Sequence, residues 1–123
     1  MSTKEALQKD LKLVIHLNGL TPMKEDSFKD FVLDQIAALD GLDCRAMFGG
    51  FGIYKDGIFF GIVYKGKFYL KTSEETRKKF EEKGMKPFRP NKKQTLKSYY
   101  EVPLEILESN RELIRWAAQS AAL

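Results

Sequence analysis

The sequence predicts a single α+β domain, with helices packed on an antiparallel sheet of about five strands. The chain has 123 residues, of which 43% are hydrophobic, and this suits one hydrophobic core. Residues 45–71 contain two glycine turns between segments rich in Phe, Tyr, Ile and Val, which is typical of antiparallel hairpins. Segments with helical apolar spacing lie on both sides of this region. The predicted order is therefore α-β-β-β-α-β-β-α after an N-terminal extension.

The first 27 residues are predicted to be an extension, and residues 28–123 the domain. Apolar residues from Leu7 to Val14 suit one face of a helix, whereas those from Leu11 to Leu17 alternate as in a strand. Helix formers between residues 4 and 12 favour a partly helical extension.

A helix is predicted over residues 27–39, because its apolar residues recur at i, i+3 and i+4. Asp26 or Ser27 is expected to cap its start, and Gly41 is expected to end it.

Three strands are predicted over residues 45–71, separated by the turns at Asp56-Gly57 and Lys65-Gly66. The middle strand is apolar on both faces, so we expect it to be covered on both sides or to lie at an oligomer interface. Gly61 is expected to leave room for a bulky neighbour. One face of this strand is predicted to carry Ile58, Phe60, Ile62 and Tyr64, and the other Phe59 and Val63.

The rest of the chain is predicted to add a helix, two strands and two helices. Residues 72–75 match the capping box of a helix that ends at Gly84. Residues 85–90 and 96–102 read as extended segments. Pro103 is expected to begin a short helix, and Asn110 to cap the last one.

Several motifs in this order resemble the TfoX N-terminal domain family, over about residues 28–120. They are Arg45-Ala46-Met47-Phe48-Gly49-Gly50-Phe51-Gly52, Asp56-Gly57-x-x-Phe60, Phe68-Tyr69-Leu70-Lys71, Phe80, Gly84-Met85-Lys86-Pro87-Phe88, Ser98-Tyr99-Tyr100-Glu101-Val102-Pro103 and the segment around Trp116.

The resemblance implies a helix, three strands, a helix, two strands and a helix. It also implies a role in regulating natural competence for DNA uptake, and no catalytic residues. Longer members of this family carry a second, C-terminal domain, so this chain resembles the stand-alone members.

The motif residues are expected to have structural roles. They are Arg45, Met47, Phe48, Gly49, Gly50, Gly52 and Gly57. The glycine-rich run lacks the Gly-Lys-Ser/Thr ending of a phosphate-binding loop, and a G-x-G-x-x-G pattern fails at Lys55. We interpret the run as a bulge or kink in the first strand.

The sequence predicts no enzyme, no cofactor and no metal site. Its one cysteine, Cys44, cannot form an internal disulfide, and with one histidine, His16, the chain cannot build a Cys/His zinc site. We expect Cys44 to be a small apolar residue at the start of the first strand.

The net charge of +4 is concentrated in one segment. Lys83–Lys97 carries six basic and no acidic residues, so the remainder of the chain sums to −2. A solvated connection between two strands is one interpretation, and a contact with nucleic acid or an acidic partner is another. The candidate contact residues are Lys86, Arg89, Lys92, Lys93 and Lys97.

Three functional hypotheses follow. The leading one is a non-enzymatic regulatory module that contacts a protein partner or forms a homodimer, with Tyr69 expected to be exposed. The second is nucleic-acid binding through Lys83–Lys97, and the third is an enzyme or small-ligand protein. The sequence shows neither an apolar run of ~20 residues nor a signal peptide, so we expect a cytoplasmic protein with no membrane partner.

Overall fold

The computed structural model describes residues 25–47 and 49–123, so Phe48 and most of the predicted extension lie outside the described residues. In this described part, an antiparallel six-stranded sheet, ordered β1-β2-β3-β4-β6-β5, carries four helices. The α+β class is confirmed, with six strands in place of about five. The elements are α2 (Glu25–Gln35), β1 (Leu42–Met47), β2 (Gly50–Lys55), β3 (Ile58–Tyr64), β4 (Lys67–Lys71), α3 (Glu74–Glu82), β5 (Pro87–Asn91), β6 (Gln94–Glu101), α4 (Leu104–Leu107) and α5 (Asn110–Ala121).

The additional strand arises at the glycine-rich motif. Met47 pairs with Gly50, so β1 and β2 are two separate antiparallel strands where the sequence indicated one kinked strand. Gly49 has a φ of +79°, which is accessible to glycine at little cost. A Cβ on Gly50 would lie 2.2 Å from the carbonyl oxygen of Val63. The two glycines therefore allow a reversal and a close approach of two backbones.

The two predicted glycine turns are confirmed. Asp56 and Gly57 have φ values of 51° and 82°, and Lys65 and Gly66 have values of 48° and 73°. Positive φ at both central residues is the mark of a type I′ turn, whose twist matches that of antiparallel strands. Strands β2, β3 and β4 are therefore joined by tight hairpins.

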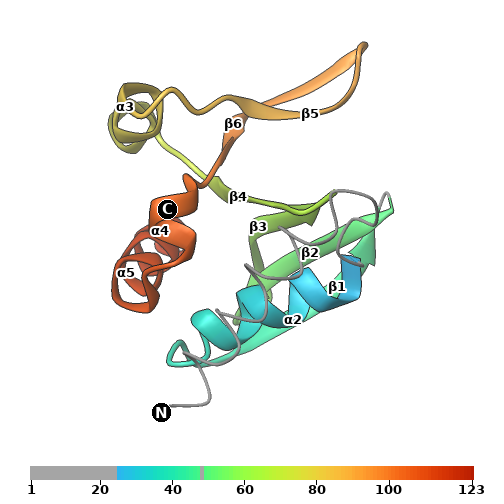
Figure 1. The fold of residues 1–123 in the computed structure, drawn as a ribbon, viewed down its shortest axis with the longest axis vertical. Coiled ribbons are helices and arrows are strands. Elements are labelled where there is room, and N and C mark those ends of the chain that lie inside the picture. The colour runs from blue at the N-terminus through green and yellow to red at the C-terminus, as the bar shows by residue number, and fades with distance from the viewer. Residues whose placement is uncertain (1–24, 48) are drawn as a thin grey trace, which may run out of the picture.

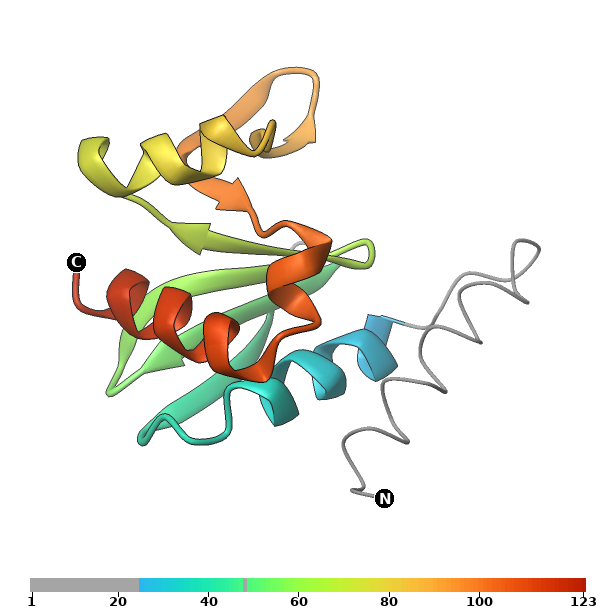
Figure 2. The same ribbon diagram turned by 60° about the vertical axis from the view of Figure 1, so that its left-hand side comes forward.

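The four helices of the described residues all contribute to one hydrophobic core, and they lie on the same face of the sheet (Figures 1 and 2). Helix α2 contributes Phe28, Phe31, Val32 and Ile36, α3 contributes Phe80, α4 contributes Ile106 and Leu107, and α5 contributes Leu113, Trp116 and Ala117. Burial of such side chains is the main source of stability for a sheet layered with helices.

Helix α2 ends earlier than predicted, at Gln35. In a longer helix the Gln35 carbonyl would accept from Leu39, but the Leu39 N–H donates to Ile36 instead. Asn110 Nδ2 donates to the Gln35 carbonyl (2.6 Å), while the buried Gln35 amide donates to the Leu107 carbonyl (2.8 Å). Contacts with α4 and α5 therefore replace the last predicted helical turn. Asp26 and Ser27 lie inside α2, so the prediction that one of them caps it was wrong.

The helix caps also differ by one residue from the prediction. Ser73, and not Thr72, caps α3: its Oγ accepts from the Thr76 N–H (3.1 Å), and the Thr76 Oγ1 accepts from the Ser73 N–H (2.8 Å). Ser109 caps α5, because its Oγ accepts a backbone N–H of the first turn. Asn110 is the first helical residue.

A β-bulge in β3 corrects the predicted strand faces. Ile53 pairs with Gly61 and Tyr54 pairs with Phe59, so Phe60 has no partner on β2. Such an extra residue reverses the alternation on one side of it. Phe60 consequently packs in the helix-covered core, not on the face of its predicted neighbours.

Helix α5 satisfies the polar backbone at this bulge. The Ser120 hydroxyl lies within hydrogen-bond distance of the Phe60 carbonyl (3.2 Å) and of the Lys71 carbonyl (2.8 Å). Ser120 is buried, so an unpaired hydroxyl there would be costly. This contact fixes α5 over strands β3 and β4.

Gly61 is predicted to be intolerant of a side chain. A Cβ at Gly61 would lie 2.9 Å from the ring of Phe68, which is fully buried. We expect Gly61→Ala to lower the free energy of unfolding by about 1–3 kcal/mol, as overpacking usually does. Urea denaturation measures this change.

The matched control is the double variant Gly61→Ala with Phe68→Leu. A smaller residue at position 68 relieves the clash with the new Cβ. The losses of unfolding free energy in the single variants Gly61→Ala and Phe68→Leu should therefore add up to more than the loss in the double variant. Strict additivity would contradict the assigned contact.

Candidate partner-binding surface

A second apolar cluster lies on the sheet face opposite the helices. Its buried members are Ile62 of β3, Tyr69 of β4, Phe88 of β5 and Tyr99 of β6. Within the described residues this cluster is built from strands alone, whereas the first cluster contains residues of every helix. The two faces of the sheet are therefore covered by different means.

Six rings form what we call the aromatic face, consisting of Tyr54, Phe59, Tyr64, Tyr69, Phe88 and Tyr99. The Phe59 ring lies 5.3 Å from Tyr54 and 5.1 Å from Tyr99, measured between centroids. The Phe88 ring lies 5.3 Å from Tyr64 and 4.9 Å from Tyr69 and meets both edge to face. These offset and edge-on arrangements are favourable for aromatic pairs.

The expectation that Tyr69 is exposed was wrong. Only 8% of Tyr69, and 8% of Tyr99, is accessible, because Phe88 and Phe59 pack against them. Burial is the largest cause that raises the pKa of each of these phenols to about 12. Tyr54, Phe59 and Tyr64 are only partly buried, so these rings give the face its accessible surface.

The family-motif residues that the structure describes include three at one end of the aromatic face. The Arg45 guanidinium lies over the Tyr54 ring, 4.9 Å from its centroid. A Cβ on Gly52 would lie 2.8 Å from the Met47 sulfur and 3.1 Å from the Phe59 ring. The absence of a side chain at Gly52 thus lets other residues pack over the strand. Gly57 lies in the turn between β2 and β3.

A sharp bend in β6 brings β5 onto this face. Pro87 pairs with Tyr100, but Phe88 pairs with Leu96, so the register slips between adjacent residues of β5. At the bend, the Ser98 carbonyl accepts from both the N–H and the hydroxyl of Thr72, at 2.6 and 2.9 Å. The C-terminal part of β6, from Tyr99 on, pairs with β4, whereas its N-terminal part, up to Leu96, pairs with β5 beyond the slip.

All five predicted basic contact residues lie on or next to the β5–β6 hairpin, and all are exposed. We call Lys86, Arg89, Lys92, Lys93 and Lys97 the basic hairpin. At its tip, Arg89 Nη2 donates to the Lys92 carbonyl (3.0 Å). Among the described residues, none of the five has a carboxylate partner within salt-bridge distance. Their positive charges are therefore available to a partner.

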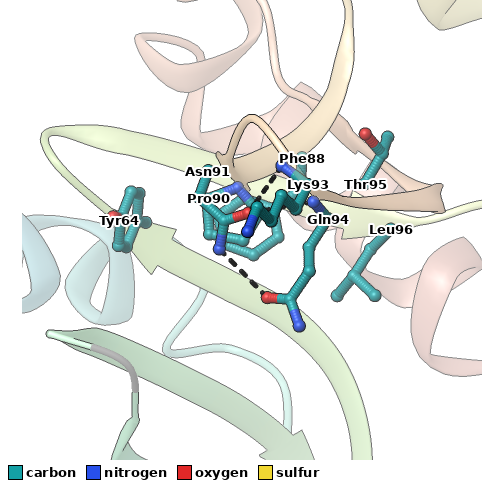
Figure 3. A pocket seen from close by; sticks show the side chains of 8 residues that line it. All are labelled: Tyr64, Phe88, Pro90, Asn91, Lys93, Gln94, Thr95 and Leu96. Atoms are coloured by element: carbon teal, nitrogen blue, oxygen red, sulfur yellow. Dashed lines mark hydrogen bonds between the residues drawn. The ribbon is translucent and has the colours of Figure 1, made fainter.

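A pocket of about 600 Å³ lies where the aromatic face meets the basic hairpin (Figure 3). Tyr64 reaches it from β3, across from the hairpin residues. The lining consists of Tyr64, Phe88, Pro90, Asn91, Lys93, Gln94, Thr95 and Leu96. Apolar walls with a few polar groups are usual for binding pockets. Sequence reasoning identified Lys93 but missed Leu96, which pairs with Phe88 within the hairpin, and Tyr64, which reaches the pocket from β3.

Residue types that ligate metals or act as nucleophiles can be located within the described residues. No three His, Cys, Asp or Glu side chains in this part of the chain come together as metal ligands. Burial is the largest cause that raises the pKa of the Cys44 thiol, so the reactive thiolate is a smaller fraction of it than of an ordinary cysteine at the same pH. His16 lies outside the described residues. No described helix is long and apolar enough to cross a membrane.

Comparison with known proteins agrees with this architecture. The TfoX N-terminal domain family matches residues 34–123, which include every strand of the sheet. The chain belongs to the TfoX N-terminal domain family. The DNA transformation protein TfoX1 of Aliivibrio fischeri (strain ATCC 700601 / ES114) is 32% identical over 80 residues. That alignment covers 63% of this chain and 36% of the relative, so the chain spans about a third of the curated TfoX protein it matches.

The buried phenols of this TfoX-type domain predict a loss of stability at high pH. Unfolded tyrosines lose their protons near pH 10, whereas Tyr69 and Tyr99 keep theirs to about pH 12. Between these values the unfolded state binds fewer protons, so the free energy of unfolding falls as pH rises. Below pH 10 the two protonated phenols make their full contribution to the free energy of unfolding.

Urea denaturation across this pH range measures the effect. The double variant Tyr69→Phe with Tyr99→Phe should lose less stability than the parent as pH rises, when each is compared with its own value at neutral pH. An equal loss in both proteins would argue against the phenols as the cause.

Proposed function

We propose that this chain is a non-enzymatic regulatory domain that contacts a protein partner in the cytoplasm and takes part in the control of natural competence. Membership of the TfoX N-terminal domain family supports the regulatory role. The name of the matched relative, a DNA transformation protein, supports the link to DNA uptake.

The accessible aromatic face is the observation that supports contact with a protein partner. The described helices all pack on the opposite face of the sheet, and the hairpin covers only part of this one. Tyr54, Phe59 and Tyr64 remain partly accessible beside Arg45. Tyrosine and arginine are enriched at protein interfaces because they combine apolar area with hydrogen-bonding groups.

Expression of this chain in a transformable strain of Aliivibrio fischeri that retains its own TfoX1 tests the proposal. If the two proteins share a partner, the added domain should change the transformation frequency, by competition or by activation. The variant Tyr64→Asp places a charge on the accessible part of the aromatic face and should remove the effect.

Leu104→Asp is the matched control, because Leu104 is 66% exposed on α4, within the helical layer. Both variants need wild-type expression and folding for the comparison. Unchanged transformation with the wild-type chain would refute a shared competence partner. An effect equally reduced by both variants would refute the aromatic face as the contact.

The same face provides a test for a homodimer. Self-association through it would appear in sedimentation velocity as a concentration-dependent increase in mass. Tyr64→Asp should abolish that increase, and Leu104→Asp should not.

The basic hairpin supports a second candidate, nucleic-acid binding. Its exposed Lys93 lines one pocket with Tyr64, and cations beside aromatic rings are a combination used to contact phosphates and bases. Neutralising Arg89, Lys92 and Lys93 together should weaken DNA binding and reduce its dependence on salt concentration. Fluorescence anisotropy with labelled single- and double-stranded DNA measures both quantities. DNA binding that persists unchanged in the triple variant would rule out this site.

A further inference from the structure

We propose that the pocket between Tyr64 and the basic hairpin binds one large apolar side chain from an acidic segment of a protein partner. This inference rests on the proposed function and names the chemistry of its partner. Three observations support the inference: the apolar lining of the pocket, the lysines at its mouth and the prolines of the neighbouring edge strand.

The walls suit an apolar side chain better than a stacked base. A base needs an open ring face, but Phe88 is only 1% exposed and is enclosed by Tyr64 and Tyr69. The ammonium of Lys65 lies over the Tyr64 ring, 5.3 Å from its centroid. Pro90 and Leu96 supply the aliphatic part of the lining, and Leu96 is 39% exposed. Burial of an apolar side chain here would remove this surface from water.

The charge at the mouth favours an acidic segment. Lys93 lines the pocket, and an adjoining hollow of about 400 Å³ shares it and adds Lys92. No acidic residue occurs from Lys83 to Lys97. On the same sheet face, Glu101 lies opposite Tyr69 in the β4–β6 pairing and is paired with Lys67 at 3.7 Å. A partner carboxylate beside the pocket would therefore meet unneutralised lysines.

The cationic tip is organised before any partner binds. The Asn91 side-chain oxygen accepts from the backbone N–H groups of Lys93 (2.8 Å) and Gln94 (2.9 Å). Asn91 Nδ2 donates to the Gln94 Oε1 (3.2 Å), and Arg89 donates to the Lys92 carbonyl (3.0 Å). Less conformational entropy is lost on binding when a site is already ordered.

The edge strand argues for recognition through side chains. Strand β5 is the last strand on this side of the sheet, where a partner could in principle add a strand. Its five residues include Pro87 and Pro90, which lack backbone N–H donors. A partner therefore gains little from pairing with β5, and the pocket supplies the specific contact.

Fluorescence anisotropy with the full chain and three labelled peptides tests the proposal. The first peptide has glutamate and aspartate around one central phenylalanine. The second replaces that phenylalanine with alanine, and the third replaces the acidic residues with lysine. We expect saturable binding of the first peptide that weakens with salt. The second should bind about tenfold more weakly, as is usual for loss of an interface anchor. The third should not bind.

Two pairs of variants locate the site. Leu96→Glu and Lys93→Glu should each weaken binding of the first peptide by about tenfold. Leu104→Glu, at an exposed position of α4, and Lys78→Glu, at an exposed position of α3, introduce the same changes elsewhere and should leave binding of the first peptide unchanged.

Amide chemical shifts of Thr95 and Leu96, followed by NMR up to millimolar peptide, provide a second readout. An absence of shift changes with the first peptide would overturn the proposal. Equal binding of the first two peptides would also overturn it, because the contact would then be purely ionic. Binding of oligothymidylate at Lys93 in place of the acidic peptide would assign the site to nucleic acid.

These outcomes are separable from those of the competence experiment. Peptide binding that depends on Leu96 supports the pocket even if the chain leaves transformation unchanged. Conversely, an effect on transformation that survives Leu96→Glu supports the regulatory role and rejects this pocket as its contact.

Discussion

The fold depends on one constraint: strand β3 has to bury apolar side chains on both of its faces. The bulge at Phe60 places that ring with Val63 in the helix-covered core, while Ile62 belongs to the opposite cluster. The helices of the described chain all serve the first face. Among the described residues, the β5–β6 hairpin alone covers the second face, and Tyr54, Phe59 and Tyr64 stay partly accessible there. The aromatic face is accessible for this reason.

The bend in β6 determines how the hairpin meets that face. Two hydrogen bonds from Thr72 to the Ser98 carbonyl anchor the bend, and the pairing with β5 slips there. Phe88 can then pack against Tyr69, and the basic hairpin comes to lie beside Tyr64. A straight β6 would extend the sheet without folding back over it. The pocket is thus a result of the same bend that buries Phe88.

The family motif shapes the aromatic face at the opposite end of the sheet, on strands β1 and β2. Its glycines permit the β1–β2 reversal and let Met47 and Phe59 pack over the backbone at Gly52. Its arginine lies on Tyr54. These contacts explain why this motif needs small residues and a cation at these positions. They give the motif a role in forming the aromatic face, which is the surface that we propose for partner binding.

The sequence by itself determined the α+β class, the two glycine turns, the room for a bulky neighbour at Gly61 and the basic segment. These follow from local composition and spacing, because turn residues and apolar periods act over a few positions. Tertiary structure decided the β1–β2 turn, the shorter α2 and the bulge at Phe60. It also decided that Tyr69 is buried and that Tyr64 and Leu96 line one pocket with Lys93. Each of these depends on contacts between segments far apart in the chain, which no local pattern records.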